Sequence, residues 1–88
     1  MKSGMLRSVE LLRLKRALGL TQYQAIGLIE CLCQMATKEA PDGNIGKFAQ
    51  EDIAAFLEWE KDAGELVRAL IQSGWIDKLQ DGSMWIHD

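Results

Sequence analysis

The chain has 88 residues, of which 48% are hydrophobic and 26% are charged. This composition is that of an ordinary globular protein, so it excludes a disordered chain and predicts one small domain. No apolar run reaches the roughly 18 residues that would span a membrane. The first seven residues start with a positive charge but have no apolar segment behind it, which excludes a secretory signal peptide. We therefore expect a cytoplasmic protein.

The charge is unevenly distributed along the chain. The net charge of −3, taken alone, argues mildly against nucleic-acid binding. Residues 1–20, however, carry five basic residues and one acidic residue, a net charge of +4, which leaves −7 on the rest of the chain. A basic N-terminal segment on an acidic body indicates either a local phosphate contact or a partner surface, for example against a second copy.

The first predicted helix runs from about Leu6 to Leu18 and ends at Gly19, a favoured residue beyond a helix C-terminus. Its core stripe at helical spacing consists of Leu11, Leu14 and Leu18. Apolar and basic residues share the opposite face, namely Val9, Leu12, Arg13 and Arg16. Exposed apolar side chains beside arginines favour packing on another chain over a solvated face, so this face is predicted to be a protein interface.

A longer helix is predicted from about Gln22 to Lys38, with Thr21 as its N-cap. Its apolar residues cover more than half of its circumference, which is typical of the central helix of a domain. These residues are Tyr23, Ala25, Ile26, Leu28, Ile29, Leu32, Cys33, Met35 and Ala36.

The two cysteines, Cys31 and Cys33, lie on this helix and project about 200° apart, so they cannot form a disulfide with each other. The only histidine, His87, is near the C-terminal end, and two thiols alone are too few ligands for a zinc site. No metal and no cofactor are therefore expected. We predict two buried thiols in a reducing, cytoplasmic compartment.

The middle of the chain predicts a turn, an extended segment and a short helix. Pro41-Asp42-Gly43 is a strong turn signal, and residues 44–48 should be extended, with Ile45 and Phe48 pointing inward. A helix is predicted from about Gln50 to Leu57, although Ala49 before it lacks a capping side chain. The predicted buried face of this helix consists of Ile53, Ala54, Phe56 and Leu57.

Trp59 is expected in the turn that leads to another helix, from about Lys61 to Ser73, which Gly74 ends. The apolar face of that helix comprises Ala63, Leu66, Val67, Leu70 and Ile71. The tail then alternates, and Asp81-Gly82 between two β-rich runs, 75–79 and 84–87, predicts a hairpin. The whole chain is thus predicted to be mainly α with a C-terminal β-hairpin, in the order α-α-β-α-α-β-β.

Two short helices joined by a tight turn, with a strand before them and a hairpin after them, form the element order of a winged helix-turn-helix. Four sequence stretches carry a closer likeness, namely Pro41-Asp42-Gly43-Asn44-Ile45-Gly46, Glu51-Asp52-Ile53-Ala54, Gly74-Trp75-Ile76, and Asp81-Gly82 with Ile86-His87-Asp88. Through them, residues 21–88 resemble the N-terminal domains of phage-type and primosomal replication proteins, the DnaD-like replisome-organiser group. The resemblance covers about three-quarters of the chain and implies a role in phage- or plasmid-like replication or regulation.

The resemblance also implies the domain organisation, because members of that group usually continue with further domains or basic tails. We expect residues 1–88 to be a single winged-helix domain excised from a longer chain. Within it, residues 1–19 would be a basic N-terminal helix and residues 75–87 the wing hairpin.

The residues themselves suggest a DNA-reading stripe on the second short helix. Its members, spaced to lie opposite the buried face, are Lys61, Glu65, Arg68 and Gln72. Arg68 suits guanine and Gln72 suits adenine, and each good bidentate contact contributes about 1–3 kcal/mol of base discrimination. The alternative is a solvated or protein-binding face with weak ion pairs, which the nearby Glu58, Glu60 and Asp62 favour because they would repel phosphate.

The hairpin offers Lys78, with Gln80 and Ser83 at its tip, as phosphate or minor-groove contacts. Trp75 and Trp85 could stack on single-stranded bases, but aromatic side chains on a small hairpin more often close the core. His87 is assigned no role.

The chain has no nucleophile–base pair and no phosphate-binding glycine loop, so an enzyme and a small-molecule substrate are not expected. The leading hypothesis is a winged-helix domain that binds double-stranded DNA through the stripe and Lys78, reinforced by Arg13 and Arg16. The alternative is a winged helix for protein–protein assembly, a homo-oligomer formed through the first helix around Val9 and Leu12. Clustering of the basic residues on one face would favour DNA, and their scattering would favour assembly.

Overall fold

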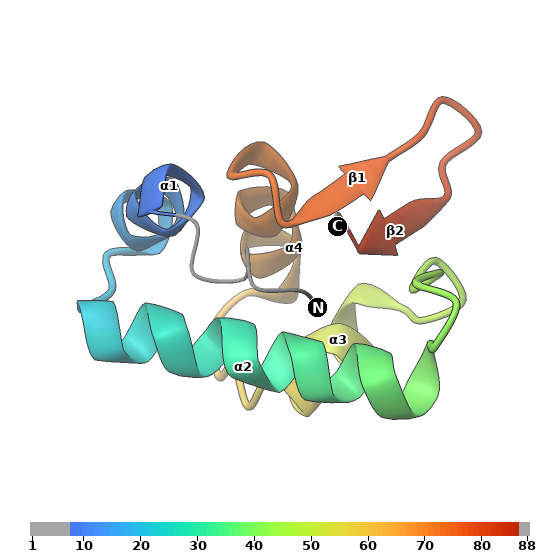
Figure 1. Cartoon of the computed structure of the whole chain (residues 1–88), viewed down its shortest axis with the longest axis horizontal. Helices are drawn as coiled ribbons and strands as arrows, with labels where there is room; N and C mark the ends of the chain where they lie inside the picture. The colour runs from blue at the N-terminus through green and yellow to red at the C-terminus, as the bar shows by residue number, and fades with distance from the viewer. Residues whose placement is uncertain (1–7, 87–88) are drawn as a thin grey trace.

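A computed structural model describes residues 8–86 of the chain. In this range the chain forms four helices followed by an antiparallel hairpin (Figure 1). The elements are α1 (Ser8–Leu18), α2 (Gln22–Glu39), α3 (Gln50–Phe56), α4 (Ala63–Gln72), β1 (Ile76–Lys78) and β2 (Met84–Ile86). The predicted mainly helical class with a C-terminal hairpin is therefore confirmed. No helix in residues 8–86 has both the length and the apolar character needed to cross a membrane.

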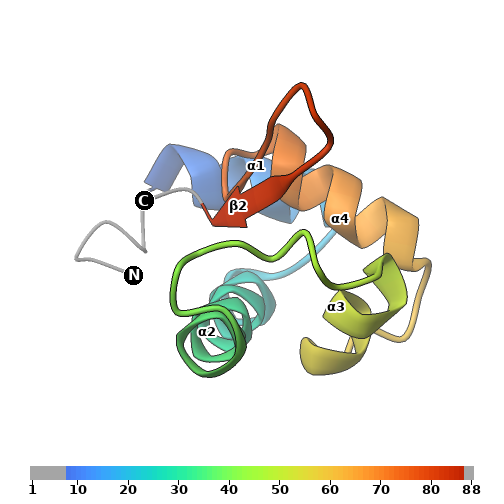
Figure 2. The same cartoon turned by 90° about the vertical axis from the view of Figure 1, so that its right-hand side faces the viewer.

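The helices and the hairpin form two layers around one core. Figure 2 shows α1, α4 and the hairpin above α2 and α3. Leu14, Leu32, Leu66 and Trp75, which come from different elements, are each fully buried between these layers. The Nε1 of Trp75 also donates a hydrogen bond to the backbone carbonyl of Glu10 at 3.3 Å, which ties the start of the hairpin to α1.

The junction between α1 and α2 agrees with the sequence analysis. Gly19 follows α1 with a φ of +66°, a left-handed conformation that glycine adopts without steric penalty. Thr21 begins α2 with a reciprocal capping box, in which Thr21 Oγ1 accepts from the Gln24 N–H and Gln24 Oε1 accepts from the Thr21 N–H. The predicted core stripe of α1, which is Leu11, Leu14 and Leu18, is buried.

Phe56 was predicted to be buried and is not, and the apolar Tyr23 of α2 is exposed as well. Tyr23 is 87% exposed, because it lies about 200° around α2 from the buried Ala25 two residues later. Phe56 is 43% exposed at the edge of the α3 face that buries Ile53. Its ring packs edge-on against Phe48, with 5.6 Å between the ring centroids.

The extended segment predicted over residues 44–48 is shorter in the structure. Only Asn44 forms a β-bridge, with Trp85, and Gly43 and Ile45 exchange backbone hydrogen bonds with β2. Ile45 points inward as predicted and is fully buried, whereas Phe48 is only half-buried. The backbone leaves the ladder after Ile45 because the N–H of Phe48 already donates to the Ile45 carbonyl in a tight turn.

The two cysteines differ, although both were predicted to be buried. Cys33 is buried, and Cys31 is half-buried beside Leu57 and Trp59. Desolvation by burial raises the pKa of the Cys33 thiol, so at neutral pH it holds less of the reactive thiolate than an ordinary cysteine. We expect a thiol reagent to modify Cys31 first and Cys33 much more slowly in the native protein. In the Cys31→Ser variant only Cys33 can react, so its modification rate is measured in the native protein and in denaturant. Equal rates in the two states would contradict the expected protection of Cys33.

Candidate nucleic-acid interface

The predicted DNA-reading stripe is largely exposed on one side of α4. Glu65, Arg68 and Gln72 all face solvent, while Leu66 and Leu70 on the other side are fully buried. Arg68 and Gln72 are four residues apart, so their side chains project from adjacent turns of the same face. The C-terminal half of the stripe therefore presents a guanidinium and an amide together.

Lys61 does not belong to this helical stripe, contrary to the sequence prediction. The side chain of Asp62 caps α4 by accepting from the Glu65 N–H at 2.8 Å, so the helix begins only at Ala63. Lys61 lies in the preceding turn, where its Nζ is 5.9 Å from the centroid of a Trp59 ring. Its ammonium thus packs over an aromatic side chain next to the helix instead of continuing the row of Glu65 and Arg68.

Two basic residues of α1 meet the C-terminal end of α4. Arg13, Arg16 and Gln72 line one shallow pocket of about 250 Å³, together with Ala17 and Ser73. Arg13 and Arg16 are exposed, and α1 packs directly against α4. Residues of α1 and α4 that were separately predicted to contact DNA are therefore brought together. Arg68 lies one helical turn before Gln72 on α4.

The other end of α4 is acidic. Glu58, Glu60, Asp62 and Glu65 are all exposed at or just before its first turn. Acidic groups here stabilise the helix, because its N-terminal amides carry partial positive charge and Asp62 satisfies one of them. The outer face of α4 is thus acidic at its N-terminal end and carries its one cation, Arg68, in the middle. Positive charge near its C-terminal end comes from Arg13 and Arg16 of α1, so a phosphate backbone would be attracted to that side only.

The hairpin tip is less available to DNA than its sequence suggests. The N–H and hydroxyl of Ser83 both donate to Asp81 Oδ1, and the Ser83 hydroxyl accepts from Trp85 Nε1. These hydrogen bonds from Ser83 lower the pKa of the Asp81 carboxyl, which keeps a negative charge at the tip. Lys78 and Gln80 remain exposed. The hairpin therefore offers Lys78 as its principal contact for a phosphate.

Trp75 is fully buried, which confirms its assignment to the core, and Trp85 is half-buried against the neighbouring loop. His87 lies outside the described residues.

An apolar groove on α3 was not predicted from the sequence. The groove has a volume of about 510 Å³ and is lined by Phe48, Asp52, Ala55 and Phe56. Its sequence signal was the position of Phe56, which lies about 60° around the helix from Ile53 and about 100° from Leu57, and therefore at the edge of the buried face.

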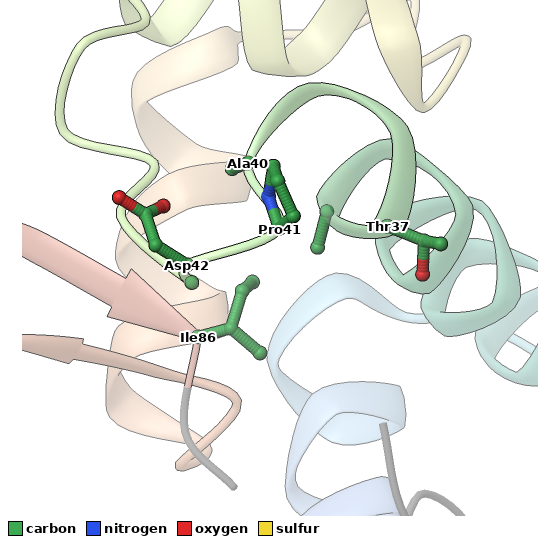
Figure 3. Close-up of a pocket in the computed structure, with 7 residues that line it drawn as sticks. Thr37, Ala40, Pro41, Asp42 and Ile86 are labelled. Atoms are coloured by element: carbon green, nitrogen blue, oxygen red, sulfur yellow. The ribbon is translucent and has the colours of Figure 1, made fainter.

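A second depression lies between the C-terminal end of α2 and β2 (Figure 3). Its polar side chains are already used within the chain. Thr37 Oγ1 donates to the Cys33 carbonyl, and Asp42 Oδ1 accepts from the Asn44 N–H. Figure 3 shows the Asp42 carboxylate directed away from Ile86, so the depression presents mainly aliphatic groups. Within residues 8–86 no three His, Cys, Asp or Glu side chains are grouped so that they could hold a metal ion.

Comparison of the chain with protein-family models, with curated proteins and with solved structures found no match. The pocket in which Arg13 and Arg16 meet Gln72, with Arg68 one helical turn before Gln72 on α4, is therefore the basis of the functional assignment.

Proposed function

We propose that the chain is a winged helix-turn-helix domain of a replication or regulatory protein, which binds double-stranded DNA and has no catalytic activity of its own. The observation that carries this proposal is the pocket in which Arg13 and Arg16 meet Gln72, next to Arg68. Guanidinium groups bind phosphates through paired hydrogen bonds, and Arg and Gln side chains form bidentate contacts with base edges.

The arrangement of the elements supports the proposal. The two short helices α3 and α4 pack against each other, and α4 leads directly into the hairpin. The β-bridge between Asn44 and Trp85 places a short extended segment beside β2. A winged helix has a strand at this position, before its two short helices. In such a domain α4 would enter the major groove, and the hairpin carrying Lys78 would lie along the phosphate backbone.

A salt-dependent titration tests this function. Duplex binding should be weak in the isolated chain, with a Kd on the order of 10⁻⁴–10⁻⁶ M, because the acidic end of α4 opposes phosphate. A plot of log Kd against log salt concentration should be linear. Its slope should rise by about 0.9 for each phosphate that Arg13, Arg16, Arg68 or Lys78 neutralises. An absence of duplex binding at low salt, or tighter binding to single strands of the same length, would contradict the proposal.

A further inference from the structure

The outer face of α1, opposite its buried leucines, combines exposed apolar and basic side chains. Val9 and Leu12 are 53% and 50% exposed, and Arg13 and Arg16 are exposed beside them. These four positions follow the spacing i, i+3, i+4 and i+7, so they form a single stripe opposite the buried leucines of α1. This is the spacing by which an amphipathic helix anchors itself in a groove of another protein.

The groove on α3, lined by Phe48, Asp52, Ala55 and Phe56, has the complementary character. The Phe48–Phe56 ring pair forms its apolar floor, and Phe56 is 43% exposed. Asp52 lines the groove, and Glu51 is exposed on the α3 turn that faces Ala55. Lys47 adds one positive charge, but its Nζ lies over the Phe48 ring, 5.4 Å from the centroid. The open face of Phe56 is therefore bordered by carboxylates.

We propose that the exposed face of α1 from one copy docks into the Phe48–Phe56 groove of a second copy. Val9 and Leu12 would cover the phenylalanine rings, while Arg13 and Arg16 would approach Glu51 and Asp52. The match is one of both polarity and charge, because apolar side chains meet the phenylalanine rings and two arginines meet two carboxylates. Within one copy α1 and α3 lie in different layers (Figure 2), and the exposed face of α1 is opposite its buried leucines, so the contact forms between copies.

The contact is head-to-tail, because the surface given by one copy differs from the surface received on the next. Each copy keeps an unoccupied groove or an unoccupied α1 face after pairing. Association therefore continues into an open chain or closes through reciprocal contacts, as a two-fold dimer or a larger ring, whereas contact between two α1 faces would leave every groove unoccupied.

The test is sedimentation of the chain without DNA over a range of concentrations. Leu12→Asp places a carboxylate on the α1 face, and Phe56→Lys removes one ring and repels the arginines. Each variant alone is expected to weaken self-association by at least about tenfold. An equimolar mixture of the two should form a 1:1 heterodimer that grows no further, because each variant retains one of the two surfaces.

Two further variants separate the interface from folding and from general stickiness. Glu51→Lys changes charge without removing packing, and it should weaken association while the far-ultraviolet circular dichroism stays unchanged. Tyr23→Lys makes the same kind of substitution at an aromatic side chain on α2 that is more exposed than Phe56, and this variant should associate like the parent.

Several outcomes would overturn the proposal. The parent could remain monomeric at every concentration, Phe56→Lys could associate as well as the parent, or the two blocked variants could fail to pair when mixed. Association is measured without DNA, and none of these variants replaces Arg13, Arg16, Arg68 or Gln72, so a failure of this interface is distinguishable from a failure of DNA binding.

Discussion

Trp75→Ala is expected to lower the free energy of unfolding by about 3–5 kcal/mol, the range for removal of a buried tryptophan. The side chain is fully buried, and it fills the junction between α4 and the hairpin behind α1. Truncation leaves a cavity and also removes the hydrogen bond from Trp75 Nε1 to the Glu10 carbonyl. The free energy of unfolding of a small domain is about 5–15 kcal/mol in total, so this single substitution removes a large share of the stability.

Urea denaturation followed by circular dichroism measures the effect without relying on tryptophan fluorescence. The matched control is Trp85→Ala, which makes the same substitution on the neighbouring strand. Trp85 is half-buried, and its Nε1 bonds to the Ser83 hydroxyl at the hairpin tip. We expect this control to lower the free energy of unfolding by about 1–2 kcal/mol. Equal losses for the two variants would contradict the assignment of Trp75 to the core.

The positions of the helices could be predicted because local residues determine where they begin and end. Thr21 begins α2 through its side-chain cap, and Gly19 and Gly74 follow α1 and α4 with positive φ. The burial of Phe56 was mispredicted because the apolar residues of α3 were assigned to one face without regard to their angle around the helix. The short strand at residues 44–48 was overestimated because its pairing depends on β2, which lies forty residues later in the chain.

The candidate site was predictable only in part. The exposure of Arg68 and Gln72 followed from helical spacing, because Leu66 and Leu70 had to face the core. Lys61 was misplaced because the competing cap at Asp62 shortens the helix. The meeting of Arg13 and Arg16 with Gln72 depends on how α1 packs against α4, which no local pattern specifies.

Arg16→Ala/Arg68→Ala is expected to cause the largest loss of duplex affinity among double variants of the chain. Each arginine that contacts a phosphate contributes about 0.9 to the salt slope, so loss of both should flatten the slope by about 1.8. If Arg68 instead reads a guanine, its loss should also reduce base preference by about 1–3 kcal/mol. Both side chains are exposed, so the free energy of unfolding should change little.

The control is Lys38→Ala/Lys47→Ala, which removes the same charge from the end of α2 and the loop before α3. Because neither lysine lies at the α1–α4 junction, this variant should keep the salt slope. Its duplex affinity should fall only slightly and equally for all sequences, because only the net charge changes. Glu65→Gln should act in the opposite direction and tighten binding, since it removes a carboxylate one turn from Arg68. Equal losses of affinity for the two double variants would mean that DNA senses only the overall charge, and the α4 surface would then have no part in recognition.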